Sequence, residues 1–213
     1  PGSERISAAE ELTRVLPILQ KLQQQFPEII LSIDTYHSEV AQQAIHAGAH
    51  IVNDISAGTM DGNMIPAVAS FGNVPYVCMH MKGTPETMQQ LAKYDDVLKE
   101  VLDFFILKTA ECRQAGIKDV IIDPGFGFAK TIAHNFSILK NLAVFNMLER
   151  PILAGISRKA TIYKTLGVTA AEALNGTTVL NTLALANGAH ILRVHDVKEA
   201  KEAIRLMQEY HNA

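Results

Sequence analysis

The sequence predicts an α/β protein of the (β/α)8 TIM-barrel class. Short β-branched apolar runs alternate with helical patterns along the chain, as they do in parallel βαβ units. Every apolar run ends in polar residues, and a barrel builds its site from all its strand ends, whereas an open sheet uses those at a switch point. No glycine-rich dinucleotide fingerprint follows any run, which also favours the barrel.

Six runs have the length and β-branched character of buried strands bounded by turn signals. They are residues 29–35, 51–56, 75–80, 120–125, 151–157 and 190–196. A closed barrel of this class needs eight strands, and the chain opens on a turn that leads directly into a helix. We therefore expect about two strands and one helix to precede Pro1, so that residues 1–213 are a single barrel domain, incomplete at its N-terminus.

Amphipathic patterns between these runs predict the helices of the outer layer. They cover residues 8–24, 38–47, 94–115, 170–187 and 198–210. Gly48, Gly116 and Gly188 follow three of these patterns, where glycine supplies the left-handed residue that ends a helix.

Composition excludes several classes of function. The 213 residues are 48% hydrophobic with a net charge of −3, and no basic block suggests a nucleic-acid partner. No apolar run approaches the roughly 18 residues of a membrane span, and no signal-peptide pattern opens the chain. Cys78 and Cys112 are expected to be reduced packing thiols, which fits a cytoplasmic protein.

Strand parity predicts which polar side chains converge at the barrel mouth, because alternate residues of a strand face opposite sides. The parity that directs Asp34 inward turns Ile33 toward the helices, and the same argument applies to the other strands. The convergent set is Asp34, Asn53, Met79, Asp123, Lys159, Arg193 and His195.

This set combines two chemistries. Asp34, Asn53 and Asp123 offer mostly acceptors, and a carboxylate accepts two parallel N–H bonds from an amidine- or guanidine-like heterocycle edge. The lysine, the arginine and the histidine offer donors and positive charge that suit phosphate or pyrophosphate. Together they indicate a heterocycle attached to a phosphorylated leaving group.

Structural explanations compete at several positions. A strand-end aspartate can serve the following turn or helix, and we expect this of Asp54 and Asp196, which lie on the opposite parity. Arg193 can pair with a strand-end acid, and Phe126 and Phe128 can belong to the core. No histidine has companions at metal-ligand spacing, so no zinc site is predicted.

Six segments together resemble the dihydropteroate synthases, in the order that this family shows. They read Ser-Ile-Asp-Thr at 32–35, Val-Asn-Asp-Ile-Ser at 52–56, Met-His-Met-Lys-Gly at 79–83, Asp-Pro-Gly-Phe-Gly-Phe-Ala-Lys at 123–130, Gly-Ile-Ser-Arg-Lys at 155–159 and Arg-Val-His-Asp-Val at 193–197. The resemblance implies a TIM-barrel transferase, usually a homodimer and a sulfonamide target. It would condense p-aminobenzoate with 6-hydroxymethyl-7,8-dihydropterin pyrophosphate, giving 7,8-dihydropteroate and pyrophosphate, with Mg²⁺ assisting.

The resemblance also implies a role for each matching residue. Pterin-binding residues would be Asp34, Asn53, Met79, Asp123, Phe128, Gly155, Lys159 and Arg193. p-Aminobenzoate would contact Phe128, Ser157, Lys159 and Pro1, and pyrophosphate would contact Arg193 and His195. The catalytic residues would be Lys159, Asp34 and Asp123. The magnesium ligand is expected before Pro1, so no metal ligand is expected in this chain.

Two alternatives remain open from the residues. A methyltetrahydrofolate–corrinoid methyltransferase shares a pterin-reading barrel, but it needs no pyrophosphate clamp and lacks the Ser-Arg-Lys and Phe-Gly-Phe segments. A non-catalytic pterin-binding fragment is the other. Turnover by a polypeptide of only these 213 residues is doubtful, and we favour a longer parent protein with normal activity.

Overall fold

Six parallel strands lie side by side in chain order and form the inner layer of the protein. The computed structural model describes residues 5–213. The strands are β1 (Ser32–Asp34), β2 (Ile51–Asp54), β3 (Tyr76–Met79), β4 (Val120–Asp123), β5 (Leu153–Ala154) and β6 (Ile191–Leu192). Hydrogen bonds join β1 to β4 in one sheet and β5 to β6 in another, and a parallel bridge from Ile122 to Ile152 connects the two.

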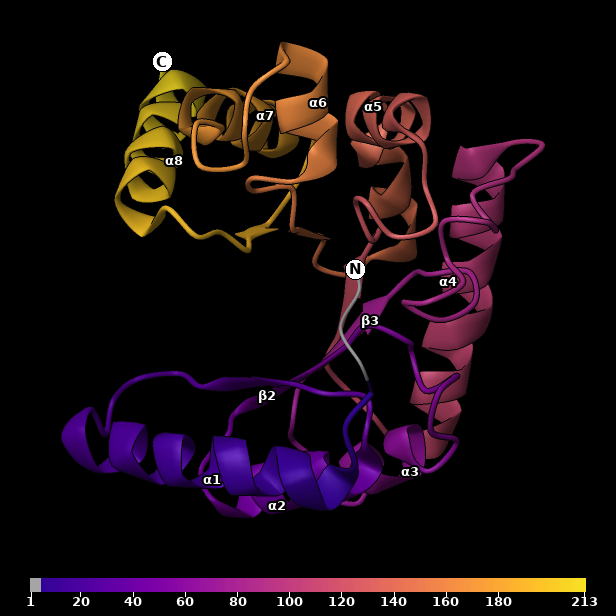
Figure 1. Ribbon diagram of the computed structural model, residues 1–213, viewed down its shortest axis with the longest axis vertical. Helices are drawn as coiled ribbons and strands as arrows, with labels where there is room; N and C mark the ends of the chain where they lie inside the picture. Colours follow the sequence, from indigo (N-terminus) through magenta and orange to yellow (C-terminus); the bar gives the residue numbers. More distant parts are fainter. Residues whose placement is uncertain (1–4) are drawn as a thin grey trace.

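Helices cover the outer side of the strands. They are α1 (Ala8–Gln25), α2 (Ser38–His46), α3 (Met64–Ala69), α4 (Val97–Ala115), α5 (Ile132–Lys140), the 3-10 helix η1 (Leu142–Leu148), α6 (Ala160–Leu166), α7 (Leu174–Ala186) and α8 (Val197–Asn212). Figure 1 shows them following one another around the strands, from α1, α2 and α3 through α4 to α5–α8. No helix in the described part of the chain is long and apolar enough to cross a membrane.

The predicted barrel architecture is confirmed: residues 5–213 contribute six parallel strands, and a complete barrel of this class has eight. The strands are shorter than the apolar runs because residues at one or both ends of each run lie outside the ladder, for example residues 29–31 before β1 and residues 55–56 after β2. Four short helices lie outside the predicted helical ranges: α3, α5, η1 and α6. They have six, nine, seven and seven residues, which is too short for a helical period to be recognised against other patterns.

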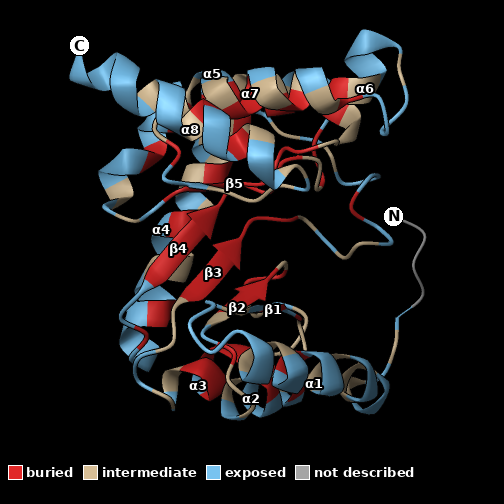
Figure 2. Cartoon of the chain, turned by 90° about the vertical axis from the view of Figure 1, so that its left-hand side faces the viewer, coloured by how far each residue is buried: buried red, intermediate tan, exposed pale blue. Residues whose placement is uncertain are grey.

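The alternation of inward and outward side chains follows the predicted parity. Ile51, Val77, Ile121 and Leu153 pack together on the inner side. Val52, Tyr76, Cys78, Val120 and Ile122 belong to the large core shared with the helices. Figure 2 shows β3 and β4 buried throughout. Cys78 and Cys112 are both buried and free, as expected for packing thiols.

Asp54 has the structural role that its parity predicted. Its carboxylate is fully buried on the helix side of β2, where Oδ1 accepts hydrogen bonds from the backbone and hydroxyl of Ser56, both at 2.7 Å. Oδ2 accepts from Gly58 N and from the Tyr76 hydroxyl, again at 2.7 Å. The turn after β2 is therefore held by one buried acid.

We expect Asp54→Ala to lower the free energy of unfolding by about 3 kcal/mol, because it strands buried donors that lose a charged acceptor. Tyr76→Phe removes only one of these donors and is expected to cost about 1 kcal/mol. Urea denaturation followed by circular dichroism measures both. Equal stability of Asp54→Ala and the unsubstituted protein would contradict the assignment.

Candidate active site

Polar side chains from four strands meet at the carboxyl ends of the strands. The strand register places Asp34 beside Asn53 and Met79 beside Asp123. Asp34, Asn53 and Arg193 line a cavity of about 280 Å³ whose other walls are apolar side chains of the inner face. The parallel strands thus deliver their polar ends to one place, as the parity argument predicted.

Arg193 joins three strand ends. Its Nη1 donates to Asn53 Oδ1 at 2.9 Å, and its Nη2 lies 2.9 Å from Asp123 Oδ2. Gly155 makes room for this arrangement, because a Cβ built there would lie only 2.7 Å from Arg193 Nη2. The guanidinium therefore spans from β6 across Gly155 to β2 and β4.

Two buried atoms at this point have no hydrogen-bond partner. Asp123 is fully buried, and its Oδ1 accepts from Gly125 N at 2.8 Å. Its Oδ2 forms the ion pair with Arg193 but has no contact of hydrogen-bond geometry, and Asn53 Nδ2 has no acceptor. Buried polar atoms are rarely left unsatisfied, so this acceptor and this donor mark a place for a ligand that carries both functions.

Asp34 supplies a second carboxylate. It has substantial solvent-exposed area on the open inner face, yet the surrounding protein partly desolvates it. Desolvation raises the pKa of Asp34, while the positive charge of Arg193 and the neighbouring Asn53 act to lower it. Of these influences desolvation is the strongest, as is common for acids in functional sites.

Lys159 lies on the opposite side of the mouth. It occupies the N-cap position of α6. Its Nζ donates to the carbonyl of Phe126 and lies 4.3 Å from the centre of the Phe128 ring. Burial lowers the pKa of Lys159 to about 8, against the opposing effect of Asp123. The pair Lys159–Phe128 offers a cation and an aromatic face in one position.

Ser157 and His195 connect the loops after β5 and β6. Ser157 Oγ lies 2.9 Å from His195 Nδ1, and His195 N donates to the same hydroxyl at 3.3 Å. Between Ser157 and Lys159, Arg158 forms two hydrogen bonds to Asp196, at 2.9 and 2.8 Å. Asp196 therefore has the structural role that its parity predicted, and the Arg158 pair aligns the residues on either side.

The phenylalanines of the loop after β4 have different environments. Phe126 is buried in the core on the helix side, whereas Phe128 is partly exposed and packs on a cluster of methionines that includes Met79. Only Phe128 is thus available to a ligand. Pro1, which was predicted to contact p-aminobenzoate, lies outside the described residues.

Sequence reasoning assigned no role to several residues that shape the mouth. Arg158 and Lys130 are charged residues inside quoted motifs, and their partners are known only from the fold. Asn135, in α5, accepts a hydrogen bond from Gly127 N at 2.8 Å and is nearly fully buried. Nothing in its local sequence distinguishes it from a surface asparagine.

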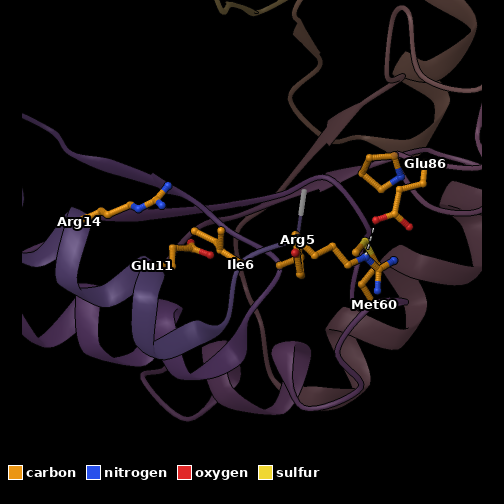
Figure 3. Close-up of a pocket in the computed structure, with 8 residues that line it drawn as sticks. Arg5, Ile6, Glu11, Arg14, Met60 and Glu86 are labelled. Atoms are coloured by element: carbon orange, nitrogen blue, oxygen red, sulfur yellow. Dashed lines mark ion pairs between the residues drawn. The ribbon is translucent and has the colours of Figure 1, made fainter. Parts of the chain in front are cut away.

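A second cavity of about 280 Å³ lies beside the loops that follow β1, β2 and β3. Arg5 and Glu86 point toward one another across it and form an ion pair at 3.3 Å (Figure 3). Both side chains are half exposed, so this pair contributes little to stability. None of the predicted site residues within the described range 5–213 lines this cavity.

Comparisons with known proteins agree on one family. The pterin-binding enzyme family matches residues 1–195. The dihydropteroate synthase of Escherichia coli K12 is 44% identical over 210 residues, which cover 98% of this chain and 73% of that protein. Among solved structures, a Yersinia pestis dihydropteroate synthase with a sulfonamide drug has a TM-score of 0.95 at 38% identity, over 100% of this chain and 77% of that one. A Xanthomonas albilineans dihydropteroate synthase with 7,8-dihydropteroate has a TM-score of 0.90 at 36% identity, over 99% and 79%.

We expect the Lys159 amine to titrate near pH 8, well below the usual 10.5, because burial disfavours its charged form. Carbon-13 NMR of the lysine Cε resonances measures this titration, and Lys159→Arg assigns the resonance by its disappearance. A second low titration near pH 7 belongs to Lys130, which is also buried. A Lys159 resonance that titrates near 10.5 would show that the amine is solvated.

Proposed function

We infer the function of this chain from its family and its site: it belongs to the dihydropteroate synthases, a family of pterin-binding enzymes. The chain is accordingly a transferase of folate biosynthesis. Its reaction joins p-aminobenzoate to 6-hydroxymethyl-7,8-dihydropterin pyrophosphate and releases pyrophosphate. The observation that carries the residue assignment is the buried pair of unsatisfied atoms, Asp123 Oδ2 and Asn53 Nδ2.

The pterin is proposed to bind on the inner face, with its guanidine-like edge toward Asp123. Its amino and ring N–H groups supply the donors that Asp123 Oδ2 lacks, and a ring nitrogen supplies the acceptor that Asn53 Nδ2 lacks. Asp34 faces the remaining ring nitrogens from β1. Met79 and Gly155 line the ring's faces, since one is apolar and the other leaves space.

p-Aminobenzoate is proposed to bind between the loops after β4 and β5. Phe128 offers a partly exposed ring beside the Lys159 ammonium, and the Ser157 hydroxyl is held by His195. An aromatic acid has matching features: a flat ring and a carboxylate that accepts hydrogen bonds. Sulfonamides, which share this shape, are expected to compete there.

Pyrophosphate is proposed to leave toward Arg193 and His195. The exposed part of Arg193 retains donors beyond those used by Asn53 and Asp123, and His195 is exposed at the same strand end. As the bond to pyrophosphate breaks, positive charge develops on the pterin and negative charge on the leaving group. The carboxylates of Asp34 and Asp123 stabilise the first, and Arg193 with His195 stabilises the second. Lys159 orients the carbonyl edge of the pterin and lies near p-aminobenzoate.

Magnesium, the homodimer and the cytoplasmic location stay predictions from the family resemblance. No group of three or more histidine, cysteine, aspartate or glutamate side chains within residues 5–213 is arranged to hold a metal ion. No step of the proposed reaction is assigned to the metal.

We expect Asp123→Asn to reduce dihydropteroate formation by about 100-fold or more, because it removes the charge that faces the pterin. Asp119→Asn is the matched control, since Asp119 is exposed just before the same strand. Pyrophosphate release that depends on p-aminobenzoate measures turnover and separates this reaction from corrinoid methyl transfer. Pterin binding by calorimetry without p-aminobenzoate incorporation would instead indicate a non-catalytic pterin-binding protein. Undiminished turnover by Asp123→Asn would remove Asp123 from the site.

We expect Gly155→Ala to weaken pterin binding by about tenfold, because the new methyl displaces the Arg193 guanidinium from Asn53 and Asp123. The clash is with the end of a flexible side chain, so the melting temperature should change little. Gly62→Ala is the control, because a Cβ there meets nothing within 4 Å. Isothermal calorimetry with a dihydropterin measures the affinity. Equal affinity for both variants would show that pterin binding does not depend on the contacts of Arg193 with Asn53 and Asp123.

A further inference from the structure

A buried lysine that the proposed reaction does not use lies directly behind the site. Lys130 is 4% exposed, and no carboxylate among the described residues forms an ion pair with it. Burial lowers its pKa to about 7. A buried ammonium without an anion is costly, so the hydrogen bonds that it makes should have a specific role.

The ammonium of Lys130 joins the loops that follow β3 and β4. Its Nζ lies 2.8 Å from His80 Nδ1, and it donates toward the carbonyls of Gly125 at 3.2 Å and Phe128 at 3.1 Å. The carbonyl of His80 lies at 3.4 Å. Burial and the positive charges nearby lower the pKa of His80 to about 2, so its ring is neutral and Nδ1 acts as an acceptor.

The loop that Lys130 holds has an uncommon backbone. Gly125, Gly127 and Ala129 all have positive φ angles, of 70°, 81° and 48°, and a non-glycine residue there is strained. Gly125 also packs tightly against the other loop, because a Cβ on it would lie 2.1 Å from the carbonyl oxygen of His80. Such a conformation persists only where surrounding contacts determine it.

This loop in turn orients the three side chains proposed to meet the substrates. The Gly125 N–H donates to Asp123 Oδ1 at 2.8 Å, and the Phe126 carbonyl accepts from Lys159. Phe128 places its ring 4.3 Å from the Lys159 ammonium. Two of the carbonyls bound by Lys130 belong to Gly125 and Phe128 in this loop, and these residues flank this set of contacts.

We propose that Lys130, held by His80, is a positioning residue that fixes the 125–129 loop and thereby aligns Asp123, Lys159 and Phe128 for pterin and p-aminobenzoate. This inference rests on the proposed function and extends it to a residue that touches neither substrate. The role of Lys130 requires its ammonium group between the two loops, and the packing of its apolar stem alone is not sufficient.

Lys130→Met tests the donor, because methionine keeps the packing of the stem but offers no N–H. We expect it to weaken dihydropterin binding by about 10- to 100-fold, as expected for lost hydrogen bonds from a charged group. In an active preparation, we also expect kcat to fall and the KM for p-aminobenzoate to rise. Lys140→Ala, at the exposed end of α5, is the control and should leave both unchanged.

Lys130→Ala tests the proposal by chemical rescue. It leaves the His80 ring and the carbonyls without their donor, so methylammonium or ethylammonium is expected to restore at least part of the lost affinity. Tetramethylammonium carries the same charge without an N–H and should not. Hydrogen exchange of the 125–129 amides should increase in both variants and slow again with methylammonium.

The outcomes separate this inference from the proposed function. If the unsubstituted protein binds no dihydropterin, the proposed function fails, and amide exchange in the loop still decides whether Lys130 holds it. Unchanged affinity and unchanged loop exchange in Lys130→Met would overturn the inference while leaving the function intact. Rescue by tetramethylammonium equal to that by methylammonium would also overturn it, because charge alone would then suffice.

Discussion

The mouth of this barrel depends on the Arg193 guanidinium between Asn53 and Asp123. It ties β6 to β2 and β4 across the inner face, and no hydrogen bond between neighbouring strands spans that distance. The contact leaves hydrogen-bonding capacity on both partners, because Asp123 Oδ2 has only the ion pair with Arg193 and Asn53 Nδ2 has no acceptor. If every donor and acceptor here were paired within the protein, the arrangement would be more stable, but no hydrogen-bonding group would remain for a ligand.

Desolvation has opposite consequences on the two sides of the mouth. It raises the pKa of Asp34 and lowers the pKa of Lys159 to about 8. In both groups the charged form is therefore less favourable than it is in water. A substrate that brings positive character toward the acid and negative character toward the lysine relieves both penalties. The site is therefore electrostatically incomplete without its ligand, which is a common condition of functional sites.

Much of the fold and of the site's composition was predictable from periodicity. Parity along each strand correctly separated inward Asp123 from outward Asp54, because successive side chains of a strand point to opposite faces of the sheet. Periodicity could not assign Phe126 and Phe128, which share parity in a loop where parity has no meaning. It also could not reveal Lys130, His80 and Asn135, since their roles come from contacts between loops that are distant in sequence. Such contacts are set by the fold as a whole.

Three of the residues that sequence reasoning overlooked share one property: Lys130, Asn135 and Arg158 bind backbone groups. Lys130 binds carbonyls, Asn135 binds the Gly127 N–H, and Arg158 binds the carbonyls of Ala170 and Ala171 as well as Asp196. Loops at a strand end have no ladder to hold them, and their polar backbone groups must still be satisfied. A long charged side chain can bind several carbonyls at once, so a single residue can hold two segments of loop together. Precise placement of the proposed catalytic groups therefore depends on a layer of such contacts behind them.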